Sequence, residues 1–153
     1  MGRIFEAVEE FLKSDDWPTQ AVEDAALIKT GFDGDSGQFS CFASARDAQD
    51  QLVFYSVFPV KAPEDKRAQV AEFITRANYG MAVGNFEMDF ADGEVRFKTS
   101  FDVEGVDLPA KLVRNLVYAN VLTMDRYFPG LMRVLYGGAS AEEAVSEIEN
   151  PAG

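Results

Sequence analysis

Histidine is absent from this chain of 153 residues, and cysteine occurs once, at Cys41. The lack of histidine removes the most common general base, every triad that needs an imidazole and every zinc site that contains one. A single cysteine excludes an internal disulfide, thiolate zinc clusters and C-x-x-C redox chemistry. Cys41 lies in a strand-like run, which favours a small core residue over a reactive thiol. We therefore expect no catalytic residue and no metal-binding residue.

Phosphate-binding loops are also missing, because neither G-x-x-x-x-G-K-[ST] nor G-x-G-x-x-G occurs. The run from Asp33 to Gly37 begins like a calcium loop. However, Gly37 and Ser44 stand where such a loop needs oxygen ligands, and Gln38 stands where it needs glycine. The run is better explained as a tight hairpin connection. We predict that the protein uses no cofactor.

Long apolar runs and a basic character are absent as well. No segment approaches the roughly 18 apolar residues that a membrane-spanning helix needs, and the N-terminus lacks the apolar part of a signal peptide, so we expect a cytoplasmic protein. The chain has 14 basic and 26 acidic residues, a formal net charge of −12. Most of the excess lies in residues 1–24 and 139–153. Repulsion at long range disfavours nucleic acid and anionic membranes as partners.

The residues that are present suit a folded globular protein. Hydrophobic residues make up 47% of the chain and include 13 phenylalanines, which favour a well-filled core. The length suits one domain, and no repeat, linker or low-complexity tract divides it. We therefore predict a single domain over residues 1–153.

Hydrophobic periodicity and turn signals predict the order of elements. The expected elements are a helix over 4–12, an antiparallel meander of strands over 26–32, 39–45 and 52–59, a helix over 63–79, a hairpin around Asp92-Gly93, a long helix from Pro109 and a short acidic last helix. Pro129-Gly130 is expected to kink or interrupt the long helix. Ser140 and Glu143 form a predicted capping box for the last helix.

The hairpin is predicted in detail because Asp92-Gly93 is a strong signal for a two-residue turn. That loop would place Met88 opposite Phe97 and Asp89 opposite Arg96. One face of the hairpin would then be apolar and buried, and it would consist of Phe86, Met88, Phe90, Val95 and Phe97. The other face would carry opposite-charge pairs in contact with solvent.

The third strand of the meander bears most on function, because both of its faces are apolar. Leu52, Phe54 and Phe58 lie on one face, Val53, Tyr55 and Val57 lie on the other, and Phe42 of the neighbouring strand fits either set. In one interpretation the helix over 63–79 covers the second face. In the other, that face or the exposed side of this helix is a dimer or client interface. We predict Val53, Tyr55 and Val57 as partner-binding residues.

Several motifs in the second half of the chain resemble the YbjN family of bacterial proteins, which are described as sensory transduction regulators. The motifs are Arg76-Ala77-Asn78-Tyr79-Gly80, Gly84-Asn85-Phe86-Glu87, Asp92-Gly93-Glu94 and the run from Met124 to Gly138. The resemblance implies a fold similar to that of type III secretion chaperones, an α+β class with helices packed on a curved antiparallel sheet. Its expected order is α-β-β-β-α-β-β-α, here with an additional last helix. Such chaperones are cytoplasmic and commonly dimeric, and the family supplies no catalytic residues.

Two hypotheses for function follow. The first is a non-enzymatic regulator or chaperone-like adaptor, in bacterial signalling or stress response, that binds another polypeptide or a second copy of itself as a homodimer. The alternative is a small-ligand sensor or a carboxylate-using enzyme, with Tyr55 or Tyr79 in a pocket between helix and sheet. A continuous apolar surface would favour the first hypothesis, and a closed pocket with converging polar groups would favour the second.

Overall fold

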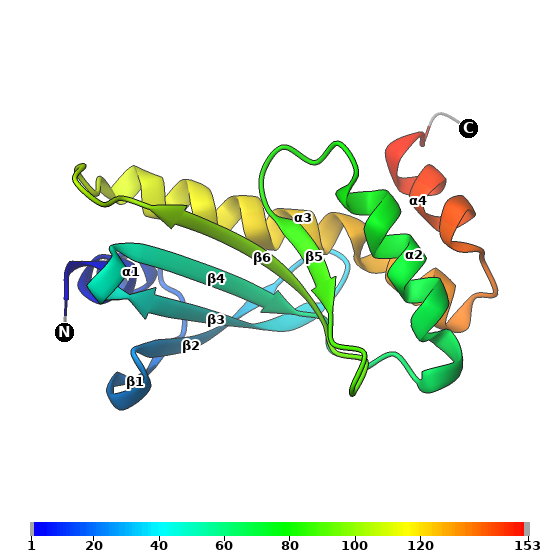
Figure 1. Cartoon of the computed structure of the whole chain (residues 1–153), viewed down its shortest axis with the longest axis horizontal. Coiled ribbons are helices and arrows are strands. Elements are labelled where there is room, and N and C mark those ends of the chain that lie inside the picture. Colours follow the sequence, from blue (N-terminus) through cyan, green and yellow to red (C-terminus); the bar gives the residue numbers. More distant parts are fainter. Residues whose placement is uncertain (1, 152–153) are drawn as a thin grey trace.

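A computed structural model describes residues 2–151 and contains a six-stranded antiparallel sheet in the order β1-β2-β3-β4-β6-β5 (Figure 1). The strands are β1 (Gln20–Val22), β2 (Leu27–Asp33), β3 (Gln38–Arg46), β4 (Gln51–Val57), β5 (Asn85–Met88) and β6 (Val95–Asp102). The helices are α1 (Arg3–Ser14), α2 (Arg67–Asn78), α3 (Ala110–Tyr136) and α4 (Ala141–Glu149). The expected α+β class and order of elements are confirmed. The short edge strand β1 is an addition that the sequence did not predict.

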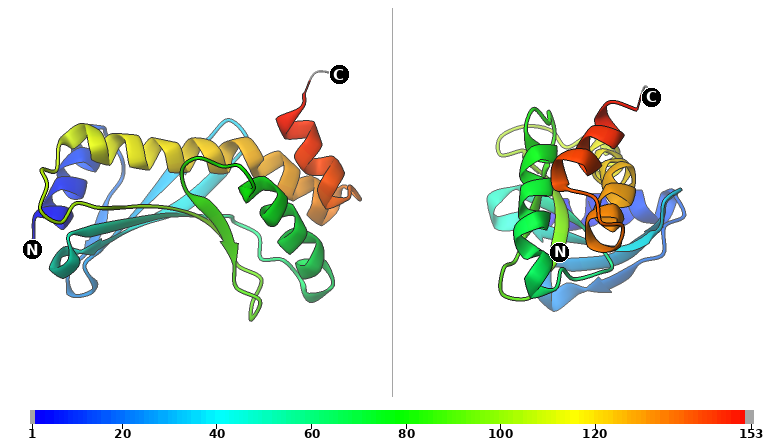
Figure 2. Two further views of the ribbon diagram at one scale, coloured as in Figure 1. Left: turned by 45° about the horizontal axis from the view of Figure 1, so that its top comes forward. Right: turned by 90° about the vertical axis from the view of Figure 1, so that its right-hand side faces the viewer.

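One face of the sheet forms the core with α1 and α3, and Figure 2 shows the strands curving beneath these helices. Alternate residues of β4 and β6, Leu52, Phe54 and Phe97, are fully buried on this face. The predicted apolar stripe of α1 packs against it, with Ile4 and Leu12 also fully buried. Burial of this face is the main source of stability, because each fully buried large apolar side chain contributes about 1.5–3 kcal/mol.

The long helix α3 runs without interruption through Pro129, so the interruption expected there is wrong, while the kink, the other expected outcome, stays a prediction. Proline removes one backbone hydrogen bond and costs about 3 kcal/mol in a helix interior. Packing on both sides of the helical turn that contains Pro129 and Gly130 offsets that cost. Gly130 is buried, and a side chain added there would meet Phe73 of α2 and Ile148 of α4. The predicted capping box of Ser140 and Glu143 at the start of α4 is confirmed.

The hairpin of β5 and β6 has a wider loop than the sequence predicted. Met88 pairs with Val95 and Phe86 pairs with Phe97, so the expected pairing of Met88 with Phe97 is wrong. The register is displaced by two residues, and an even displacement keeps the same side chains on each face. Phe86, Val95 and Phe97 are therefore buried as expected, but Phe90 falls in the loop and is 61% exposed.

Side-chain hydrogen bonds within the loop explain the wider turn. The carboxylate of Asp89 accepts a hydrogen bond from the amide of Ala91, and that of Asp92 accepts one from the amide of Glu94. Aspartate side chains that satisfy nearby amides in this way compete with strand pairing. Asp89 is therefore part of the loop and does not face Arg96, which pairs with Glu87 instead.

Gly93 anchors this loop to the segment that precedes α2. Its φ of 81° lies in the left-handed region, and its carbonyl accepts a hydrogen bond of 2.8 Å from the amide of Ala62. A Cβ atom at position 93 would collide with the carbonyl of Ala62. Glycine is needed here both for its φ and for the close approach of the two backbones.

We expect Gly93→Ala to destabilise the protein more than Gly105→Ala. Gly105 also has a positive φ, 74°, but nothing lies within 4 Å of a Cβ atom added there. Gly105→Ala should cost about 1–2 kcal/mol from the left-handed backbone alone. Gly93→Ala should cost about 1–3 kcal/mol more because of the clash with Ala62. Urea unfolding of both variants measures the difference, and equal costs would contradict the docking of the loop on Ala62.

The described part of the chain, residues 2–151, contains no helix that is both long enough and apolar enough to cross a membrane.

Candidate functional site

The second face of the sheet, here called the uncovered face, points away from α1 and α3. Figure 1 looks onto this face, with the two helices behind the strands. Val53, Tyr55 and Val57 of β4 lie on it and are half-buried, while Leu52 and Phe54 between them are fully buried on the other side. The alternation predicted for β4 is therefore confirmed. The role of these residues in partner binding stays a prediction.

The helix α2 does not cover this face, so the interpretation in which it does is wrong. It packs on β5, α3 and α4, and Phe73 on its inner side meets the ring of Tyr127 of α3. At its end the side chain of Asn78 donates to the carbonyl of Phe86 and accepts from the amide of Phe86. These bonds fix the end of α2 to the edge strand β5. The second predicted surface, the exposed side of α2, is thus not joined to Val53, Tyr55 and Val57.

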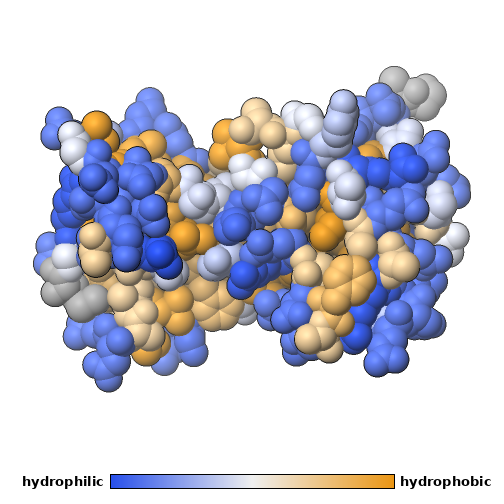
Figure 3. Space-filling model, viewed as in Figure 1, coloured by the Kyte–Doolittle hydropathy of each residue, from blue (hydrophilic) through white to orange (hydrophobic). Residues whose placement is uncertain are grey.

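Three cross-strand rows make up the centre of the uncovered face. The middle row runs across β2, β3, β4 and β6 as Lys29, Phe42, Tyr55 and Lys98, each residue directly opposite the next. The rows on either side contain Leu27, Ser44, Val53 and Ser100, and Gly31, Ser40, Val57, Arg96 and Glu87. Phe42 therefore belongs to the same set as Tyr55. Figure 3 shows apolar side chains over β3 and β4 on this face, beside a hydrophilic cluster over β5 and β6.

Basic side chains frame the aromatic pair. The guanidinium of Arg96 lies over the ring of Tyr55, 4.0 Å from its centre. The same group donates a hydrogen bond of 2.6 Å to Glu87, and the Lys98 ammonium lies 3.4 Å from the second oxygen of that carboxylate. The stacked arginine holds the ring of Tyr55 in place.

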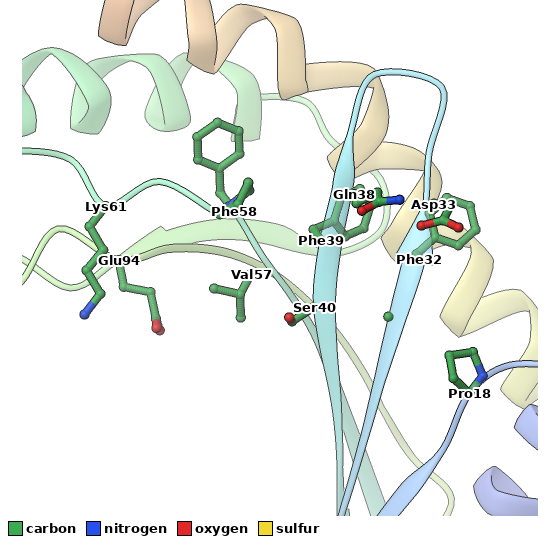
Figure 4. Close-up of a pocket in the computed structure, with 12 residues that line it drawn as sticks. Pro18, Phe32, Asp33, Gln38, Phe39, Ser40, Val57, Phe58, Lys61 and Glu94 are labelled. Carbon is green, nitrogen blue, oxygen red and sulfur yellow. The ribbon is translucent and has the colours of Figure 1, made fainter.

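An open groove of about 570 Å³ continues the uncovered face at the ends of β2, β3 and β4 (Figure 4). Val57 and Ser40 belong to both the groove and the face. In Figure 4 the side chains of Lys61 and Glu94 reach toward the same side as Val57, whereas Phe58 points away toward the helices. The groove opens to the surface, and it is not the closed pocket between helix and sheet that a small-ligand site would need.

The titratable groups with the largest pKa shifts lie away from the uncovered face. Burial raises the pKa of the Cys41 thiol to about 12, which fits the core residue expected from the sequence. Burial and a hydrogen bond to Glu149 raise the pKa of Tyr127 to about 12. Tyr79, named for the alternative hypothesis, is 90% exposed at the end of α2, whereas Tyr55 lies on β4.

Acidic residues do not gather into a metal site within the described chain, where no group of three or more potential ligands occurs. The run from Asp33 to Gly37 connects β2 and β3 as a hairpin, as the sequence predicted. Asp125 of α3 fixes this connection, because its carboxylate accepts hydrogen bonds from the amides of Asp35 and Ser36.

A family model described as "Putative bacterial sensory transduction regulator" matches residues 5–133 of the chain, which is most of its length. The chain belongs to the YbjN family. In this YbjN protein the motif Asn78-Tyr79-Gly80 has a structural explanation, since Asn78 holds the edge of β5 and Gly80 follows α2 with a φ of 81°. The helix α4 lies beyond the matched residues. Comparison with curated proteins finds no match.

Two solved structures have a similar fold. A chain of the HopA1–SchA chaperone–effector complex superposes with a TM-score of 0.50 at 16% identity, over 82% of this chain and 93% of that one. A chain of the ExsC–ExsE complex superposes with a TM-score of 0.57 at 11% identity, over 91% of this chain and 100% of that one. The fold expected from the resemblance to type III secretion chaperones is confirmed.

The sequence alone missed the basic residues around Tyr55. Lys29 lies on β2, whereas Arg96 and Lys98 lie on β6, and only the pairing of the strands brings them to the same face. A usable signal was present within β2 and within β6. Lys29 lies two residues from Leu27, and Lys98 lies two residues from Arg96, so each pair shares a face of its strand.

Proposed function

We propose that this YbjN protein is a non-enzymatic regulator or chaperone-like adaptor that binds another polypeptide in the bacterial cytoplasm, in signalling or stress response. The observation that carries the proposal is the uncovered face, where Phe42, Val53, Tyr55 and Val57 form an apolar surface that no helix of the described chain covers. Contiguous apolar surface of this kind, edged by polar residues, is typical of interaction sites.

The similar folds of chains in the HopA1–SchA and ExsC–ExsE complexes support this proposal. The first of these is a complex of a chaperone with an effector. A fold alone does not determine a function, so the proposal rests mainly on the uncovered face.

The occupant that we propose is a polypeptide other than this chain. Self-association through the same face, as a homodimer, is a second prediction. It ranks below a different polypeptide because the net charge of −12 makes two copies of this chain repel each other at a distance. A monomer of this length should have a radius of gyration of about 15 Å. A larger radius and mass in solution scattering would show a dimer.

The small-ligand alternative has less support. The groove of about 570 Å³ has a suitable size, but it opens onto the uncovered face and shares Val57 with it. A side chain of a bound polypeptide can use this groove as a pocket, which links it to the first hypothesis.

We expect Tyr55→Glu to abolish recovery of a polypeptide partner when the tagged protein is purified from its native host. A carboxylate in the middle of the apolar surface would have to lose its water on binding, which is costly. Leu122→Glu is the matched control, because Leu122 is 55% exposed on α3, on the side of the molecule away from the uncovered face.

Mass spectrometry of the recovered material measures the effect. Partners retained by the wild type and Leu122→Glu but lost by Tyr55→Glu support the proposal. If Tyr55→Glu retains the same partners, or if only Leu122→Glu loses them, the uncovered face is not the interface.

A further inference from the structure

The middle row of the uncovered face places one lysine at each end of an aromatic pair. Across the sheet, Lys29 is opposite Phe42, Phe42 is opposite Tyr55, and Tyr55 is opposite Lys98. Lys29 is exposed, and Lys98 is about one-third exposed. A ligand that covers the two rings therefore comes within reach of both ammonium groups.

The charge of this surface is opposite to the charge of the molecule. The chain carries −12 overall, yet the three central rows contain Lys29, Arg96 and Lys98 against the single carboxylate of Glu87. Glu87 is shared between Arg96 and Lys98, at 2.6 and 3.4 Å. Among residues 2–151, no carboxylate lies within 4 Å of the Lys29 ammonium. The surface thus keeps a local excess of positive charge.

We propose that the uncovered face recognises an extended polypeptide segment in which an apolar side chain lies between two acidic ones. This inference rests on the proposed function and adds the chemistry of the partner. The apolar side chain would pack on Phe42 and Tyr55, and the two carboxylates would pair with Lys29 and Lys98.

The spacing of the strands sets the spacing of the acidic residues. Lys29 and Lys98 are three strands apart, which corresponds to about 14 Å at 4.7–4.9 Å for each strand. An extended chain advances about 3.3 Å for each residue, so it crosses that distance in roughly four residues. Alternate side chains of an extended chain point to the same side. The partner motif is therefore acidic, any, apolar, any, acidic.

A polypeptide fits this surface better than a nucleic acid. The overall charge repels a polyanion, whose many phosphates extend beyond the small basic area. Screening limits each charge interaction to about 8–10 Å in physiological salt, so a short acidic segment seated on the face senses mainly Lys29, Arg96 and Lys98.

Fluorescent peptides test the proposal with the full-length protein. Three peptides share the same apolar centre and carry glutamate, glutamine or lysine at the two flanking positions of the motif. We expect the glutamate peptide to bind roughly two- to thirtyfold more tightly than the glutamine peptide, from two exposed ion pairs, with the lysine peptide weakest. The preference should shrink as salt is added.

Charge reversal supplies the control. Lys29→Glu with Lys98→Glu should invert the order of the three peptides. Lys66→Glu with Lys111→Glu changes the net charge equally at sites away from the uncovered face, and it should preserve the order.

The outcomes separate the two proposals. Equal binding of all three peptides would overturn the acidic motif and leave polypeptide binding standing. Binding of none of them would contradict both. Tighter binding of a single-stranded oligonucleotide than of the glutamate peptide would assign the basic residues to a nucleic acid and overturn the inference.

Discussion

Asn120→Ala should lower the free energy of unfolding by about 3–5 kcal/mol, because Asn120 joins α3 to two strands inside the core. The side chain is fully buried. Its amide nitrogen donates to the carbonyls of Phe54 and Phe97 at 2.8 and 3.1 Å and lies 3.1 Å from the hydroxyl of Thr99. Its oxygen accepts a hydrogen bond from the hydroxyl of Ser56.

The size of this effect comes from the groups that the substitution leaves behind. Alanine would leave the Ser56 hydroxyl without its strong acceptor and would open a cavity between α3 and the junction of β4 with β6. A buried polar group without a partner costs about 1–3 kcal/mol, and the cavity adds to that cost.

Urea unfolding followed by circular dichroism measures the loss. Leu122→Ala is the control, two residues away on the same helix with a side chain that is 55% exposed, and it should change stability by less than about 0.5 kcal/mol. A loss below about 1 kcal/mol for Asn120→Ala would show that the network does not hold α3 on the sheet.

Phe97→Ala should cost about 3–5 kcal/mol, while Phe90→Ala in the same hairpin should be close to neutral. Phe97 is fully buried and packs edge-on against Phe86, with ring centres 4.8 Å apart. The two-residue turn favoured by the sequence would bury Phe90 as well, whereas the six-residue connection over 89–94 leaves it exposed.

The contrast between the two variants decides the register of the hairpin. Similar, large losses of stability for both variants would support the register of the tight turn, in which Met88 is opposite Phe97. A large loss for Phe97→Ala alone supports the wider loop, in which Met88 is opposite Val95.

Local sequence patterns predicted the structure correctly where residues close in sequence determine it. The helical spacing in α1, the alternation in β4 and the capping box of Ser140 and Glu143 depend on residues close in sequence, and each is present as expected. Pro129 shows the limit of such rules. The helix continues through it because Phe73 and Ile148, distant in sequence, pack around the following glycine.

The errors in the hairpin and in α2 have the same origin. The loop is widened by aspartate side chains and is held by Ala62, some thirty positions before it. The position of α2 depends on Asn78, which attaches the helix to the edge of β5 and keeps it off the uncovered face. Neither contact has a periodic signal in the sequence.

The candidate site was predictable in part. Alternation identified Val53, Tyr55 and Val57, but it could not decide whether the protein covers them itself. It also could not place Lys29 and Lys98 beside the aromatic pair, because that arrangement requires the register of four strands.

Site-specific photo-crosslinking in the native host tests the central claim most directly, the claim that the uncovered face binds a polypeptide. A photoreactive phenylalanine analogue is placed in turn at Phe42, on the uncovered face, and at Leu122, on α3. We expect a crosslinked polypeptide other than this chain from position 42 and none from position 122. Crosslinks from position 122 alone, or from neither position, would contradict the claim.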